Sequence, residues 1–210
     1  DSSLYVSRRF NNGNLYLRGN NTNDQASMAA GAGTLYLNGT SAQQLSGAQA
    51  FRTFRLETNN TAGITLNNNL RIADLHTFTN GIITTSATNF LVYEAGSSYT
   101  GDADSRHVNG WVKKIGSTNF IYPVGNGTYA RRITVANLSA ASEFNVRHRT
   151  TTPNYNTVQY PLFQADRFEY WDVNRVSGGT AVLGMNWDNS RISFPDYALS
   201  EVRVSHYNGS

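Results

Sequence analysis

The chain has 210 residues, a formal net charge of +3 and no cysteine. Without cysteine it forms neither a disulfide nor a thiolate metal site. Charged residues make up only 15% of the sequence, and asparagine, threonine, serine and glycine fill most of the polar positions. This composition favours strands and tight turns over long helices.

Charge and hydropathy also argue against two classes of partner. The basic residues occur as separate pairs, Arg8-Arg9, Lys113-Lys114 and Arg131-Arg132, and not as one patch with interleaved aromatic side chains. The sequence therefore argues against nucleic-acid binding. No apolar run approaches the roughly 20 residues that cross a bilayer, which argues against direct membrane insertion.

A four-residue motif with apolar second and fourth positions recurs through the first half of the chain at intervals of 16 to 20 residues. Its copies are 14–17, 34–37, 53–56, 69–72 and 89–92. Such spacing predicts stacked coils, each of which adds one short strand to a parallel sheet. Strand alternation then places the third residue of each copy on one outer face, namely Tyr16, Tyr36, Arg55, Arg71 and Leu91. An antiparallel sandwich with frequent turns is the alternative.

Asparagine and glycine mark the expected corners of these coils, as in Asn38-Gly39, Asn67–Asn69 and Asn80-Gly81. Both residue types tolerate the positive φ angles that sharp corners require. Asparagines at equivalent corners are also able to stack into hydrogen-bonded ladders. The sequence thus predicts a β-helical region over residues 1–104.

Longer alternating strands follow, for example Glu143–Arg149 and Tyr197–His206, separated by glycine- and serine-rich turns. Period-two alternation with one polar face is typical of antiparallel sheets. The second predicted domain is therefore an antiparallel β-sandwich-like unit over residues 105–210. The fold class expected for the whole chain is all-β, with a parallel β-helix in front packed against this sandwich-like back.

Two blocks of the second region carry a distinctive pattern. They are Val108-Asn109-Gly110-Trp111-Val112-Lys113-Lys114, and Phe120-Ile121-Tyr122-Pro123-Val124-Gly125 followed by Arg131-Arg132-Ile133. The pattern resembles a module of secreted Bacteroidota proteins, in which a β-helical stretch ends in a "V-N-G-x-V-x-K" strand and a "P-V-G" strand follows. The resemblance covers roughly residues 34–210, and the "P-V-G" block is its most specific part.

This resemblance implies a large, multidomain, extracellular or cell-surface protein exported by the type IX secretion system. Adhesins, gliding-associated surface proteins and surface filaments are typical settings. The implied partners are other domains of the same long polypeptide or neighbouring subunits. The resemblance also implies that the second domain is truncated at Ser210, and it supplies no enzymatic role for any residue.

Acidic residues are the first candidates for chemistry, because β-helical polysaccharide-degrading enzymes use two or three acids on neighbouring coils. Glu57, Asp74 and Glu94 follow copies of the motif at similar offsets and are expected to stack along one edge, where a solvated acidic edge is the favoured interpretation. Asp102 and Asp104 lie two residues apart in a glycine-flanked loop, which weakly resembles a structural calcium site. No other cofactor is expected.

Aromatic residues are the second candidates, since exposed rings stack on sugars. Tyr170, Trp171 and Trp187 are the predicted glycan contacts. Alternation places Tyr170 on one face of its strand and Trp171 on the other, so only one of the two is available outside the core.

A third candidate surface is an assembly strand formed by Leu4, Tyr5, Val6 and Phe10, which would cap the solenoid, continue an upstream coil or pair with a neighbouring subunit. The function expected from all these features is a non-catalytic structural or adhesive module of a surface protein or filament. A carbohydrate-binding module is the alternative, and a polysaccharide-degrading β-helix enzyme is the third hypothesis.

Overall fold

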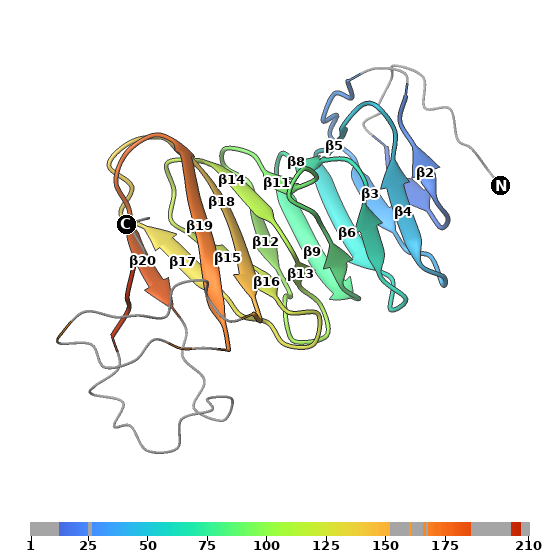
Figure 1. Ribbon diagram of the computed structural model, residues 1–210. Coiled ribbons are helices and arrows are strands. Elements are labelled where there is room, and N and C mark those ends of the chain that lie inside the picture. The colour runs from blue at the N-terminus through green and yellow to red at the C-terminus, as the bar shows by residue number, and fades with distance from the viewer. Residues whose placement is uncertain are drawn as a thin grey trace.

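The protein is described by a computed structural model, shown in Figure 1. The structure describes residues 13–24, 27–151, 160, 166, 168–185 and 203–206. Within these residues there are strands, bends and turns but no helix, and accordingly none that is long and apolar enough to cross a membrane.

The first part of the chain winds into a solenoid with three parallel sheets, in which successive coils stack side by side (Figure 1). Sheet A contains β1 (Leu15–Leu17), β3 (Thr34–Leu37), β6 (Arg55–Asn59), β9 (Leu75–Asn80) and β12 (Ser98–Thr100). Sheet B contains β2 (Asn21–Thr22), β4 (Gln43–Ser46), β7 (Ile64–Leu66), β10 (Ile83–Thr84), β13 (Val108–Asn109) and β16 (Val124–Gly125). Sheet C begins with β5 (Phe51–Thr53), β8 (Leu70–Ile72), β11 (Leu91–Tyr93) and β14 (Val112–Gly116).

Alternating burial along these short strands builds the core. In β7, for example, Ile64 and Leu66 are buried while Thr65 between them faces outward. Residues of the same kind repeat at the same register in the next coil, as Leu35 does beside Leu15 and Leu37 beside Leu17. Burying each such side chain contributes roughly 1.5–3 kcal/mol. The stacked coils therefore share one continuous apolar interior.

The motif copies do not all belong to one sheet. Copies 14–17 and 34–37 pair in register in sheet A, but copies 69–72 and 89–92 lie in sheet C. The expected outward position of Leu91 is wrong: it pairs with Leu70 inside the core, and Val92 takes the place beside Arg71. The reason is that copy 89–92 is offset by one residue, so that its third residue aligns with the second residue of copy 69–72.

Antiparallel pairing begins later than the predicted boundary at residue 105. Strands β13, β14 and β16 still pair in parallel with the solenoid. Sheet C then continues with two antiparallel strands, β18 (Ser142–Arg149) and β19 (Tyr170–Ser177). A separate antiparallel sheet D consists of β15 (Phe120–Tyr122), β17 (Ile133–Ala136) and β20 (Val182–Met185).

Sheet D packs on the antiparallel end of sheet C. Phe144 and Val146 of β18 belong to the same buried cluster as Ile133 and Val135 of β17. The hydroxyl of Tyr122 donates a hydrogen bond to the backbone oxygen of Phe144, 3.3 Å away, and so joins the two layers. The structure thus confirms the predicted fold class, an all-β chain with a parallel solenoid and an antiparallel, two-layered back.

Candidate functional site

The three acids expected to share one edge do not occupy equivalent places in their coils. Glu57 lies within β6 on the outer face of sheet A, where it pairs with Tyr36. Asp74 and Glu94 lie in the corners between sheets C and A of successive coils, Asp74 between β8 and β9 and Glu94 between β11 and β12. The predicted stack is therefore wrong for Glu57, because motif copy 53–56 spans the end of β5 and the start of β6, whereas copies 69–72 and 89–92 both lie in sheet C.

Arginines neutralise two of these acids. Asp74 accepts a hydrogen bond from Nε of Arg55 at 2.7 Å. Glu94 lies between two arginines of neighbouring strands: its Oε2 is 2.7 Å from Nη2 of Arg52, and its Oε1 is 2.8 Å from Nε of Arg71. Burial by itself would raise the pKa of Glu94, but the hydrogen bonds and charges of the two arginines outweigh it and lower the pKa. This carboxylate is held ionised as a clamp across three coils, and its oxygens are already occupied.

We expect Glu94→Gln to lower the free energy of unfolding by about 1–2 kcal/mol at pH 7, because charge-assisted hydrogen bonds to both arginines are weakened. The lowered pKa sets the sign of the pH dependence: the stabilisation is present above the carboxylate's unfolded pKa of about 4.5 and disappears as the pH falls through the folded value. Urea denaturation of the parent and of Glu94→Gln at pH 7 and pH 3 measures this difference in the free energy of unfolding. Glu57→Gln is the matched control, since within the described residues Glu57 accepts a single side-chain hydrogen bond, at 3.3 Å from Thr79; equal losses in the two variants would contradict the clamp.

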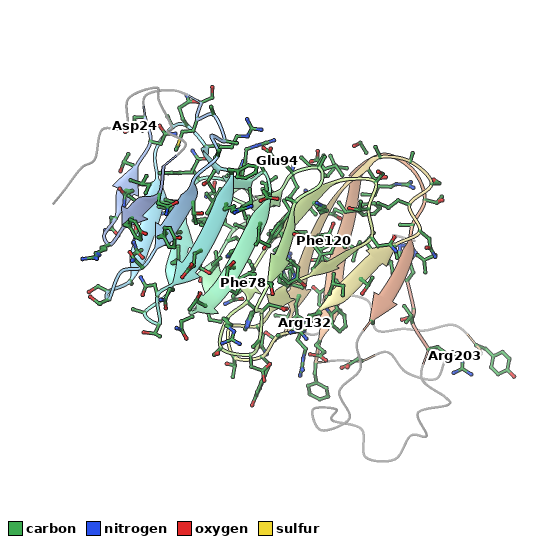
Figure 2. The ribbon with its side chains drawn as sticks, turned by 180° about the vertical axis from the view of Figure 1, so that it is seen from behind. Asp24, Phe78, Glu94, Phe120, Arg132 and Arg203 are labelled. Carbon is green, nitrogen blue, oxygen red and sulfur yellow. The ribbon has the colours of Figure 1, made fainter. Side chains whose placement is uncertain are left out.

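The two aspartates proposed as calcium ligands are engaged by the protein itself. Nε of Arg132 donates to Asp102 Oδ2 at 2.5 Å, and the Ala130 amide donates to Asp104 Oδ1 at 2.9 Å. Arg132, which holds Asp102, lies on the opposite side of the molecule from Glu94 in Figure 2, so these two ion-paired groups are separate. Among the residues that the structure describes, no group of three or more His, Cys, Asp or Glu side chains is placed to hold a metal ion.

The candidate aromatic residues on β19 face in opposite directions. Trp171 packs against the core, and its indole N–H donates to the backbone oxygen of Arg131 at 2.8 Å. Tyr170 lies beside Arg149, whose guanidinium is 5.8 Å from the ring centre. The Trp171 ring is thus packed against the core and does not stack on a sugar. Trp187 and the proposed assembly strand with Leu4, Tyr5, Val6 and Phe10 lie outside the described residues.

A buried polar group that the sequence did not reveal occupies the interior of the fourth coil. The His76 ring lies between the Thr58 hydroxyl, 3.1 Å from Nε2, and the Tyr93 hydroxyl, 2.8 Å from Nδ1. It also contacts Phe78, with 3.8 Å between ring centres. Burial lowers the pKa of His76 to about 3, so the ring is neutral at ordinary pH.

Lys114 is the second unpredicted interior group. Its register partner Tyr93 faces inward, and so does the lysine. The ammonium donates to the backbone oxygens of Glu94 and Ser97 at 2.8 and 2.7 Å and lies 5.1 Å from the ring centre of Phe120. Burial lowers the pKa of Lys114 to about 8. Both interior groups are satisfied by the fold, and this arrangement is typical of structural residues.

Searches of protein-family models, curated proteins and solved structures found no match to this chain.

Proposed function

We propose that this chain is a non-catalytic structural and adhesive module of a large extracellular bacterial surface protein. The observation that carries the proposal is the stacking of coils into three parallel sheets, closed at one end by the antiparallel layers. Such a scaffold displays extended surfaces and keeps them rigid. The location outside the cell, the type IX export route and the Bacteroidota source rest on the resemblance of the "V-N-G-x-V-x-K" and "P-V-G" blocks.

The arrangement of the acids supports the non-catalytic assignment. Glycoside hydrolysis needs two carboxyl groups that flank one bond, and one of them must carry a proton. Here Glu94 is ion-paired with two arginines and Asp74 with one. The lowered pKa of Glu94 disfavours the protonated form that an acid catalyst requires.

The test combines shape with activity. We expect X-ray scattering and light scattering to give an elongated particle of one stable mass, and we expect no release of reducing sugar or unsaturated product from a panel of polysaccharides. Product release that is lost in Glu57→Gln or Asp74→Asn would overturn the proposal in favour of a polysaccharide-degrading enzyme.

A further inference from the structure

The charged residues of the solenoid are confined to two of its three sides. In the three coils that follow the first, the segments that form sheet B and its flanking corners are 38–50, 60–69 and 81–90, and none contains Asp, Glu, Lys or Arg. Ion pairs occur on the other two sides of the same coils, between Arg55 and Asp74 on sheet A and around Glu94 on sheet C. Sheet B therefore presents a neutral outer face.

Polar side chains form an ordered row on this face. Gln44, Thr65, Thr84 and Asn109 are successive register partners in β4, β7, β10 and β13. Each alternates with a buried residue and so faces outward. Thr22 and Ser46 begin a parallel row, with their hydroxyls 3.1 Å apart. Because neighbouring strands lie about 4.8 Å apart, these donors and acceptors repeat regularly along the solenoid axis.

Some of these groups are free to accept a ligand. The hydroxyls of Thr65 and Thr84 make no hydrogen bond to the part of the chain that the structure describes. Asn67 supports the row from the side by donating to the amide oxygen of Gln44 at 3.1 Å. Gln44 is thus held in place by Asn67, whereas the hydroxyls of Thr65 and Thr84 remain able to bind a ligand.

An exposed aromatic ring stands at one end of the row. Asn109 pairs with Gly125 of β16, and a Cβ at Gly125 would collide with the backbone oxygen of Tyr129. The turn that carries Tyr129 therefore lies over the outer face of sheet B. Tyr129 is 41% exposed, and the Arg131 guanidinium lies 5.7 Å from its ring centre.

We infer that sheet B binds a neutral, hydroxyl-rich polysaccharide, with the chain of sugars running along the Gln44–Asn109 row and one sugar stacked on Tyr129. The inference rests on the proposed adhesive function and names its partner. Acidic polymers find no cation on the row itself. A protein partner would find no large exposed apolar anchor on the described strands of sheet B, and protein interfaces depend on such anchors. Side-chain amides and hydroxyls, which both donate and accept, match sugar hydroxyls without the desolvation of a charge.

Charged residues do border this face at its two ends. Arg18 and Asp24 belong to the first coil, and Asp102, Asp104 and Arg106 lie in the loop before β13. Asp102 and Asp104 are engaged by neighbouring groups of the protein, as described above. The inferred contact is accordingly centred on Thr65 and Thr84, in the middle of the row.

Co-sedimentation of the full chain with insoluble cellulose, chitin and β-1,3-glucan tests the inference, with soluble alginate in a gel-shift assay as the acidic comparison. We expect binding to at least one neutral polymer that persists in 0.5 M salt to within about twofold, because screening does not weaken contacts between uncharged groups. Thr65→Lys and Thr84→Lys should each weaken this binding by about tenfold or more, because a solvated charge would be buried under the polymer. Thr77→Lys is the matched control, since Thr77 faces outward at the equivalent place on sheet A, and it should bind as the parent does.

A second pair of variants tests the aromatic end. Tyr129→Ala should weaken binding about fivefold to tenfold, whereas Tyr16→Ala, which removes an exposed tyrosine of sheet A, should not. Thermal melting verifies that all five variants are folded. Absence of binding to every neutral polymer, binding to alginate alone, or equal losses in the sheet A controls would overturn the inference. Reducing-sugar release is measured in the same tubes: cleavage would overturn the non-catalytic function, whereas absent binding without cleavage overturns only the polysaccharide assignment.

Discussion

Replacing Gly81 with alanine is expected to lower the free energy of unfolding by about 3 kcal/mol or more, and in the extreme to prevent folding. Gly81 forms the corner between β9 and β10 with a φ of +89°. A Cβ built there overlaps the backbone oxygen of Asn60 in the preceding coil. The backbone of one coil thus rests directly on the next, and the only residue that permits this approach in a left-handed conformation is one without a side chain.

Gly96→Ala provides a matched control for this prediction. Gly96 has a similar φ of +79°, but a Cβ there meets no atom within 4 Å. The Gly96→Ala variant should lose only the stability that the left-handed conformation costs an alanine, about 1 kcal/mol. Urea denaturation of the two variants and the parent separates the contributions of contact and conformation. If both variants lost the same stability, the close stacking at the Gly81 corner would not be the cause.

Acid is expected to destabilise the chain strongly through His76. Its pKa is about 3 in the folded chain and about 6.5 when unfolded, so between these values the unfolded chain binds one more proton. The free energy of unfolding should therefore fall as the pH is lowered from 6.5 towards 3. At about 1.4 kcal/mol per pH unit, the upper limit of this loss is about 5 kcal/mol.

The window from pH 6.5 to pH 5 isolates the histidine, because most carboxylates titrate below it. His76→Gln keeps a donor and an acceptor for Thr58 and Tyr93 but does not titrate, so its stability should change less with pH than that of the parent. A smaller dependence should remain, since burial also lowers the pKa of His107. His206→Gln, which alters an exposed histidine, is the control and should retain the slope of the parent. A parent slope that His76→Gln leaves unchanged would contradict the assignment.

Local patterns predicted much of this fold. The alternation around Leu15 and Leu35 identified parallel neighbours, and Asn80-Gly81 identified a corner that does adopt positive φ. Gly39 is a corner for a different reason: a Cβ there would approach the backbone oxygen of Arg18, while its φ is not in the left-handed region. Turn composition reveals where the chain bends, but close approach between coils depends on a partner about 20 residues away.

The candidate site was harder to predict because each full coil has three sides. Alternation shows that Glu57 and Arg71 face outward, but it does not show that they face outward from different sheets. The two adjacent lysines show a related limit, because alternation does not say which of them faces inward. Lys113 pairs with Glu143 at the surface, whereas Lys114 enters the core. Only the register with Tyr93, set by the whole coil, determines which of the two is buried.

Sheet C passes from parallel to antiparallel pairing without a gap, from β5 through β14 to β19. The aromatic cluster beneath it contains Phe78 and Tyr93 of the solenoid and Phe120 of sheet D, and Phe78 and Phe120 are labelled in Figure 2. The two architectural halves are consequently one cooperative unit, which should melt in a single transition. A fragment that ends near residue 104 would bare the hydrogen-bonding edge of β11 and the ring of Tyr93, and such an edge recruits other chains. Shortened versions of this protein should therefore aggregate unless they retain the strands up to β20.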